Sequence, residues 1–198
     1  MKHCLAIFAI SATLLGCDSN YDQAGIDTVE QDIAKAEEFI DAFYSFNPSR
    51  LAALLDRAEN SKPDILFYQG WAEGGNYKIM NRKPCAPVRA DSIACPVTVD
   101  DDLINALGIT FDVTDTFELT FSRGDVIAVE TSSDDPPEFH AAKDWVRRHR
   151  PELIEVPCQG YFAGGPTPGA CVRAMVQGYK EFATIRGSER NSQGSAAT

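Results

Sequence analysis

Basic residues and histidine are scarce in this chain. Its 198 residues include 18 lysines and arginines against 29 aspartates and glutamates, which gives a net charge of -11, and there are only 3 histidines. Because an acidic chain is repelled by polyanions, we expect neither nucleic acid nor anionic lipid as a partner. His140 and His149 are the histidines in the body of the chain, and we assign neither a catalytic role.

The sequence also lacks the common motifs of cofactor and metal sites. It contains no C-x2-C pair, no Gly-x-Ser-x-Gly and no His-Glu-x-x-His, and its paired glycines fit neither a dinucleotide nor a phosphate loop. The run Asp100-Asp101-Asp102 departs from a calcium loop, because Asn105 stands where the sixth-position glycine belongs. We therefore predict no cofactor and no metal, and we expect the aspartates to cap a helical turn over 103–107.

The apolar run at the N-terminus is too short to cross a bilayer as a permanent helix. Leu5 to Leu15 spans about 11 residues, whereas a hydrocarbon core of roughly 30 Å needs about 20. Lys2 and His3 give the run a positive start. A short apolar segment after a positive start is typical of a signal peptide rather than of the folded domain.

The residues that end this run, Leu14-Leu15-Gly16-Cys17, resemble the lipobox of bacterial lipoproteins. The resemblance implies removal of residues 1–16, acylation of Cys17, a tether over 17–27, and anchoring on the periplasmic or other extracytoplasmic face of the cell envelope. Since one acyl chain binds a membrane only marginally, multiple acylation is implied. An ordinary secretory signal that happens to end in a cysteine is the alternative, and the choice between inner and outer membrane stays open.

Cysteine usage follows from the signal peptide. Of the 6 cysteines, Cys4 would leave with the signal and Cys17 would carry the lipid, so four remain. An even number of cysteines in an oxidising compartment predicts two disulfides. Three pairings are open, and we favour the local one because each pair brackets a loop that contains proline and polar or glycine residues. The predicted bridges are Cys85 with Cys95 and Cys158 with Cys171.

Hydrophobic periodicity predicts an α+β fold. Apolar residues at helical spacing predict helices over 28–46, 51–58 and 63–73, the first of them starting at a capping-box-like Asp27 and Glu30. Strands are predicted over 77–80, 94–99, 117–121 and 126–131, with one buried sheet face. The turn between the last two strands, Ser122 to Asp125, is typical of a hairpin because its glycine supplies a positive φ.

The C-terminal third returns to helical spacing. A helix that carries Phe139 and Trp145 is expected to stop at Pro151. A glycine-rich loop follows, and Thr167-Pro168 opens a last helix. Residues 187–198 are serine, glycine, asparagine and alanine for the most part, and we expect them to be disordered.

Several stretches together resemble the bacterial nuclear transport factor 2-like (SnoaL-like) family over residues 28 to 150. The stretches are Phe67 to Glu73 with Asn76-Tyr77, the two cysteines 85 and 95, Asp100 to Gly108, the Phe117 to Val129 hairpin, and Phe139 with Trp145-Val146. The resemblance implies a cone, in which a strongly curved antiparallel sheet wraps on the N-terminal helices around a pocket. We expect this domain over 28–186, with the last helix as an addition to it.

The pocket candidates are aromatic residues and one histidine: Tyr68, Trp71, Tyr77 and His140. Enzymes of the family that the chain resembles pair a tyrosine or a histidine with an acid. We assign no catalytic residue here, because Glu118 alternates with apolar neighbours and should face solvent, and Asp100 is expected to end a strand.

The leading hypothesis is a lipid-anchored, non-catalytic domain of the cell envelope that binds a small apolar ligand or a partner protein. The rival hypothesis is an isomerase or a hydrolase that acts on a small organic substrate in the cone. A carboxylate or a histidine deep in the cone, within hydrogen-bond reach of a tyrosine, would favour the enzyme. A third hypothesis is association into a homodimer through an apolar outer face of the sheet.

Overall fold

The computed structural model describes residues 20–159 and 168–195, with side chains over 28–159 and 168–189. The predicted signal peptide, Cys17 and the glycine-rich loop lie outside these ranges. The fold combines helices with an open antiparallel sheet, as predicted. The elements are α1 (Asn20–Phe43), α2 (Pro48–Leu54), α3 (Lys62–Gly74), β1 (Lys78–Arg82), β2 (Ala86–Arg89), β3 (Ser92–Asp100), α4 (Asp102–Leu107), β4 (Val113–Ser122), β5 (Asp125–Ser133), α5 (Pro137–His149), α6 (Pro151–Ile154) and α7 (Pro168–Ser195).

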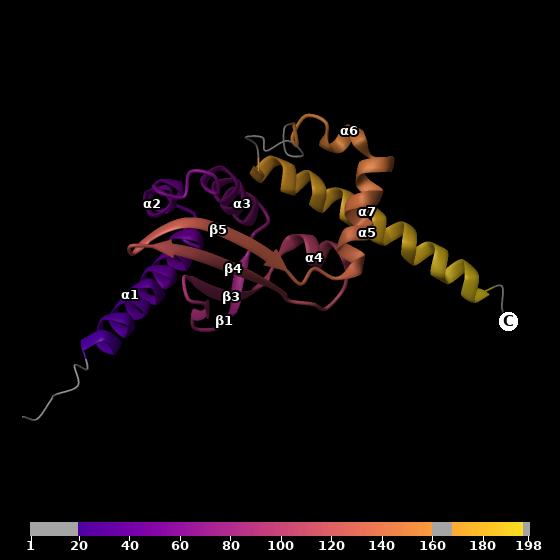
Figure 1. Ribbon diagram of the computed structural model, residues 1–198. Helices are drawn as coiled ribbons and strands as arrows, with labels where there is room; N and C mark the ends of the chain where they lie inside the picture. The colour runs from indigo at the N-terminus through magenta and orange to yellow at the C-terminus, as the bar shows by residue number, and fades with distance from the viewer. Residues whose placement is uncertain (1–19, 160–167, 196–198) are drawn as a thin grey trace, which may run out of the picture.

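The helices lie in two groups. The first three run along the sheet, and α4 to α7 gather beside one end of it (Figure 1). Capping residues set the starts of α2 and α4, as predicted, whereas α1 begins before the predicted start at Asp27. The Asn47 side chain accepts hydrogen bonds from the backbone of Ser49 and Arg50 before α2, and Asp101 does the same for Leu103 and Ile104 before α4.

The sheet is antiparallel throughout. Strands β1, β3, β4 and β5 are neighbours in that order, and β2 pairs with the first half of β3, on the edge where β1 pairs with its second half. The β4–β5 hairpin turns at Arg123 and Gly124, both of which have positive φ. Two consecutive residues of this kind form the tight turn that matches the twist of a hairpin, so the predicted turn is confirmed.

Several boundaries differ from the sequence-based expectation. Helix α1 begins at Asn20, inside the stretch expected to be a tether, and α7 runs to Ser195 through the tail expected to be disordered. Both extensions continue helices that are already nucleated on a packed segment, and adding one residue to an existing helix costs little. The short elements β2 and α6 were not predicted at all.

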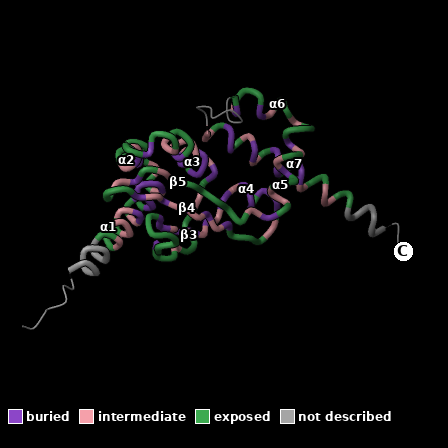
Figure 2. Tube along the Cα trace, viewed as in Figure 1, coloured by how far each residue is buried: buried purple, intermediate pink, exposed green. Residues whose placement is uncertain are grey.

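Two hydrophobic clusters make up the core. One lies between α1–α3 and the inner face of the sheet, and the other joins α3 and α4 to α5, α6 and α7. Figure 2 shows buried segments in both places. Four half-buried residues contact both clusters: Tyr68, Tyr77, Ile109 and Phe139. These residues mark the junction between the sheet half and the helical half of the molecule.

The last helix packs on other helices. Helix α7 contacts α3, α4, α5 and α6, so the addition to the minimal predicted domain builds the second cluster. Its contact with α3 is close, because Gly74 lies against the backbone of Gly169, and a Cβ at position 74 would lie 2.7 Å from Val172 Cγ1. Small residues at this crossing allow the two helix backbones to approach each other.

Replacing Gly74 with alanine should therefore destabilise the fold. The added methyl group has only backbone and a packed valine to displace, so we expect a loss of about 2 kcal/mol in the free energy of unfolding, measured in urea. Gly187→Ala on the same α7 is the control, because a Cβ there would meet nothing within 4 Å beyond its chain neighbours and the backbone of its own helix. That variant should match the wild type or gain up to about 1 kcal/mol. Equal stabilities of the two variants would contradict the close crossing.

Both predicted disulfides are confirmed. Cys85 bonds to Cys95 and Cys158 to Cys171, with Cα–Cα distances of 4.3 and 4.4 Å. All four cysteines are buried. Two disulfides fit an oxidising, extracytoplasmic compartment. None of the helices in the described ranges combines the length and the apolar character that crossing a membrane requires.

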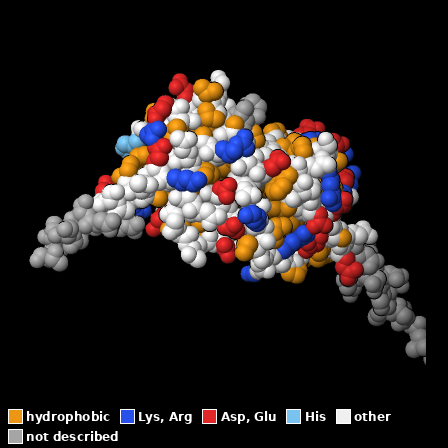
Figure 3. All heavy atoms as spheres, turned by 180° about the vertical axis from the view of Figure 1, so that it is seen from behind, with side chains coloured by type: hydrophobic (Ala, Val, Ile, Leu, Met, Phe, Trp, Pro, Cys, Tyr) orange, Lys and Arg blue, Asp and Glu red, His pale blue; other side chains and the backbone are white. Residues whose placement is uncertain are grey.

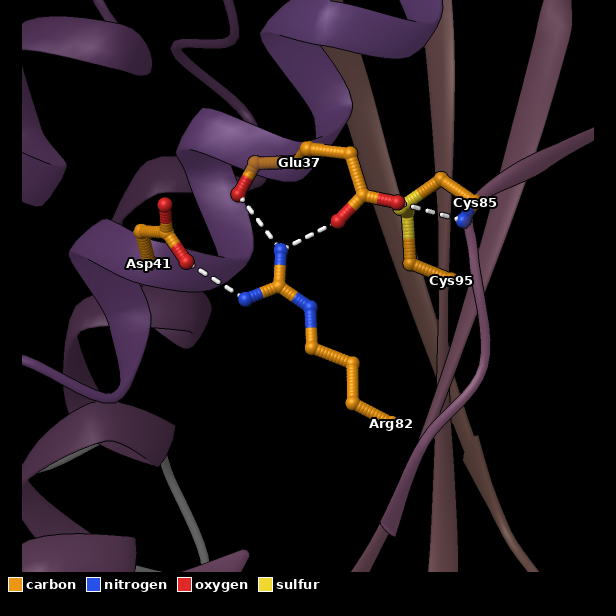
Figure 4. The surroundings of a disulfide bond; sticks show 5 residues. All are labelled: Glu37, Asp41, Arg82, Cys85 and Cys95. Atoms are coloured by element: carbon orange, nitrogen blue, oxygen red, sulfur yellow. Dashed lines mark hydrogen bonds and ion pairs between the residues drawn. A yellow bond between two sulfur atoms is a disulfide. The ribbon is translucent and has the colours of Figure 1, made fainter.

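The first disulfide lies beside a group of charged residues (Figure 4). The Arg82 guanidinium donates to the carboxylates of Glu37 and Asp41 on α1, and the other oxygen of Glu37 accepts from the Cys85 backbone N–H at 2.6 Å. The connection between β1 and β2 is thereby held both to α1 and, through the disulfide, to β3. Elsewhere, on the face shown in Figure 3, acidic and basic side chains are interspersed.

Candidate functional site

A cavity of about 260 Å³ lies at the junction of the two clusters. Its apolar wall is aromatic and comes from three places in the chain: α3, Tyr77 in the connection from α3 to β1, and α5. Because β4 and the end of β5 supply the opposite wall, the cavity requires both halves of the molecule. The five aromatic lining residues are Phe67, Tyr68, Trp71, Tyr77 and Phe139.

The polar part of the wall contains both signs of charge. Asp115 comes from β4, Ser133 from the end of β5, Asp135 from the connection to α5, and Lys143 from α5 itself. Ser133 Oγ donates to Asp135 at 3.1 Å. Two carboxylates, one ammonium and the β5 residues Thr131, Ser132 and Ser133 therefore complete a wall that is otherwise aromatic.

Asp115 owes its position to the alternation of β4. Inward and outward residues alternate along this strand, and Val113, Phe117, Leu119 and Phe121 fill the inward places together with Asp115. The side chain of Asp115 is therefore on the core face, where its residue is only 2 % exposed. Its Oδ2 has no hydrogen-bond partner among the described residues. A buried carboxylate oxygen of this kind is costly to leave unpaired.

Burial raises the pKa of Asp115 to about 6. Desolvation is the largest cause, and the negative charges of Asp135 and Asp101 add to it, whereas hydrogen bonding from Tyr68 and Ser133 acts in the opposite direction. A carboxyl group with a pKa of about 6 is divided between its acid and base forms near neutral pH. Such a group can both accept and donate a proton.

The tyrosines of the cavity stay protonated. Burial raises the pKa of Tyr68 well above its usual value, and the charge of Asp115 adds to the increase. Burial likewise raises the pKa of Tyr77, with the charges of Asp101 and Asp115 as further causes, while a hydrogen bond from Trp71 opposes them. Both hydroxyl groups therefore act as hydrogen-bond donors at neutral pH.

Two further aspartates act on Asp115 through their charge: Asp135, which lines the cavity, and Asp101, which does not. Desolvation raises the pKa of Asp101 to about 6, although the backbone N–H groups of Ile104 and Leu103 stabilise its charged form. Desolvation also raises the pKa of Asp135, against hydrogen bonding from Ser133 and the positive charges near it on α5. The cavity thus lies beside three carboxylates that repel one another.

The structure brings three of the four predicted pocket residues together. Tyr68, Trp71 and Tyr77 line the cavity, whereas His140 is exposed and does not line it. The His140 ring meets the outer part of Phe139 edge-on, with 5.6 Å between the ring centres. His140 lies outside the cavity because the buried face of α5 consists of Ala142 and Val146, and position 140 is on another face of that helix.

The other two residues weighed from the sequence lie away from the cavity. Glu118 is on the outward face of β4, as its alternation predicts, and it is half-buried there because it pairs with Arg89 of β2. Asp100 accepts a hydrogen bond from Asn105 Nδ2 at 2.8 Å. Its neighbour Asp101 is the helix cap, so the predicted capping role of the aspartate run is confirmed.

Asp115 was missed from the sequence. The strand was expected to start at Phe117, whereas it starts at Val113. Continuing the Phe117–Leu119–Phe121 alternation back by one step places Asp115 on the inward face, and this step is visible in the sequence. An aspartate at an inward position of a strand is rare enough to indicate a site.

The comparisons with known proteins add no relative. No family model matches this chain, and neither the curated proteins nor the solved structures contain a significant match to it.

Proposed function

We propose that this chain is an enzyme that transfers a proton on a small organic substrate, as an isomerase or a hydrolase does. The observation that carries the proposal is Asp115, a buried carboxyl group in the cavity wall next to Tyr68, with a pKa of about 6. A carboxylate deep in the pocket beside a tyrosine is the feature that separates this hypothesis from the non-catalytic one.

The two side chains have complementary roles in such a reaction. Asp115 removes a proton from the substrate and returns it, because its pKa lies close to the working pH. The Tyr68 hydroxyl stays protonated. It donates to Asp115 without a substrate, and it would turn to donate a hydrogen bond to the substrate oxygen on which negative charge develops. A dry, aromatic surrounding strengthens both interactions.

The remaining parts of the proposal concern the cellular location of the protein and its fold. We propose that Cys17 carries a lipid and that the domain lies on the extracytoplasmic face of the cell envelope, which the two disulfides support. We also propose the cone of the nuclear transport factor 2-like domain. The order of three helices and an antiparallel sheet supports it, as does a cavity between the α3 helix and the inner sheet face.

A second candidate function is the non-catalytic binding of a small ligand. The observation in its favour is the wall of five aromatic side chains, which suits stacking and shape recognition whether or not a reaction follows. The two candidates differ in what Asp115 does once a ligand is bound.

The test is a reaction screen with the full chain. Small ketones would be incubated in heavy water, and exchange at the carbon next to the carbonyl would be followed by proton NMR; small esters and epoxides would be screened for hydrolysis. Asp115→Asn is expected to lower the rate by at least about 100-fold. Asp112→Asn, on an exposed loop, is the control and should keep the wild-type rate. Equal rates for wild type and Asp115→Asn would contradict the proposal, and ligand binding without any reaction would favour the second candidate.

A further inference from the structure

We infer that the ligand of this cavity is an organic cation, an amine or a quaternary ammonium compound. The inference rests on the proposed function for the place of the ligand and goes beyond it in naming the ligand's charge and chemical class. It combines a buried negative charge that the described part of the protein leaves unpaired with an aromatic wall that suits a cation.

The first observation is the missing countercharge. Asp115 and Asp135 line the cavity, and Asp101, which does not line it, interacts with both through its charge. None of them forms an ion pair with a lysine or an arginine in the residues that the structure describes. Buried charges in proteins are normally paired, because an isolated one is expensive to remove from water. The charge of Lys143 acts on Asp135, whereas Asp115 has no ion pair among the described residues, so a positively charged ligand would supply the charge that Asp115 lacks.

Asp115 shows where that charge would lie. Its residue is 2 % exposed, it lines the cavity, and its Oδ2 has no partner among the described residues. The carboxylate therefore has almost no contact with solvent, and its residue forms part of the wall of the space that the ligand would occupy. Asp101 is equally buried, but its side chain is engaged by the backbone of Leu103 and Ile104, so it contributes charge at a distance.

The second observation is an ammonium group that already lies against the aromatic wall. Lys143 Nζ lies over the Phe139 ring, 5.9 Å from its centre, and its charge acts on Asp135. An ammonium over an aromatic face is held by the negative face of the ring. The tethered Lys143 thus shows, near Asp135, the type of contact that a free cation would make deeper in the cavity with the indole of Trp71 and the phenol of Tyr77.

A bound cation also suits the proposed chemistry. A positive charge beside Asp115 stabilises its ionised form, which is the form that accepts a proton. The ligand would therefore prepare the carboxylate as a base at neutral pH. The titratable groups that interact with this carboxylate are Tyr44, Tyr68, Tyr77, Asp101 and Asp135, and His140 and Lys143 act on Asp135.

The experiment compares two probes of equal shape. Choline carries a quaternary ammonium, and 3,3-dimethylbutan-1-ol has carbon in place of the nitrogen and no charge. Their dissociation constants for the full chain would be measured by calorimetry at pH 7.5 in a potassium buffer. We expect choline to bind at least about 10-fold more tightly than the neutral isostere. At pH 5 this preference should shrink by about tenfold or more, because Asp115 becomes protonated.

Two lysine variants keep the test independent of Asp115 and of folding. Lys143→Met removes the competing ammonium, so choline should bind about 3-fold more tightly or better, while the isostere should be unaffected. Lys180→Met removes the same charge from an exposed position of α7 that is not part of the cavity, and it should change neither affinity. Asp115→Asn should abolish the preference for choline.

Equal affinities for choline and its isostere in the wild type, or weaker choline binding after Lys143→Met, would overturn the inference. Such a result would leave the proposed function in place if the Asp115-dependent reaction were still observed with an uncharged substrate. Conversely, tight and selective choline binding without any Asp115-dependent reaction would contradict the proposed enzymatic function and would support the cation site.

Discussion

Replacing Asp115 with asparagine is expected to stabilise the fold at pH 7.5 by about 3 kcal/mol. The pKa of the Asp115 carboxyl group is about 6 in the folded chain, against 3.8 for the free side chain. The folded state therefore holds its proton more tightly than the unfolded chain does. Asparagine has the same shape, cannot ionise, and carries no buried charge at neutral pH.

The sign of the pH dependence follows from this difference. Between about pH 4 and pH 6 the folded chain binds more protons than the unfolded one, so the stability of the wild type falls as the pH rises through that range. Above pH 6 the carboxylate is ionised in both states, and the penalty is complete. Asp101, whose pKa burial also raises to about 6, contributes a penalty of the same sign.

Urea unfolding at pH 7.5, 6, 5 and 4 measures both parts of this prediction. The difference between Asp115→Asn and the wild type should be largest at pH 7.5 and should disappear near pH 4. Asp112→Asn, which is exposed, controls for the loss of one negative charge from an acidic chain. An Asp115→Asn protein that is less stable than the wild type at pH 7.5 would show that the carboxylate is a structural residue.

The combination of greater stability and lost activity would be informative. A residue that destabilises the fold while it lies in a cavity wall is typical of a functional site, because selection for stability alone would favour a neutral side chain there. The same variant thus distinguishes a site from a structural polar residue. If Asp115→Asn were more stable than the wild type and kept both ligand binding and the reaction, Asp115 would be neither a functional residue nor a structural one.

The elements with intact hydrophobic periodicity could be predicted from the sequence. The stripes of α1 and α3, the alternation of β4 after Phe117 and the Gly124 turn all appear in the structure. The pairing of the cysteines was also predictable, because both bridges join residues close in sequence. Periodicity says little about where an element ends, since solvent-exposed ends are free of packing constraints.

The candidate site was harder to predict, because it depends on where a strand starts and on which face of a helix a residue lies. The local sequence pattern determines both of these poorly. The inward position of Asp115 depends on a strand start that was placed four residues late, and the outward position of His140 depends on the rotation of α5. The aromatic wall was easier, because Tyr68, Trp71 and Tyr77 lie within a short stretch of α3 and the residues that follow it. The cavity itself depends on the docking of α5 beside the sheet. This long-range contact cannot be predicted from a local sequence pattern.

Loss of the Cys85–Cys95 bridge is expected to lower the free energy of unfolding by about 3 kcal/mol, the second large effect. The bridge spans 10 residues, and without it the unfolded chain regains the freedom of that loop. Both cysteines are also buried against the first cluster. Cys85→Ala combined with Cys95→Ala removes the bridge, and reduction of the wild-type chain should produce a similar loss that reverses on reoxidation.

The Arg82 group makes the prediction more specific. Arg82→Met removes the ionic contacts of β1 with Glu37 and Asp41 but leaves the disulfide intact, and because these contacts are partly exposed we expect a loss of only about 1 kcal/mol. If the bridge holds the β1–β2 connection in place for Arg82, the two losses will not add, because Arg82 and Glu37 can meet only when that connection is fixed. Urea unfolding of the bridge variant, of Arg82→Met and of their combination closes this cycle. Strict additivity, or a bridge variant as stable as the wild type, would show that α1 holds the connection by itself and that the disulfide contributes little to the fold.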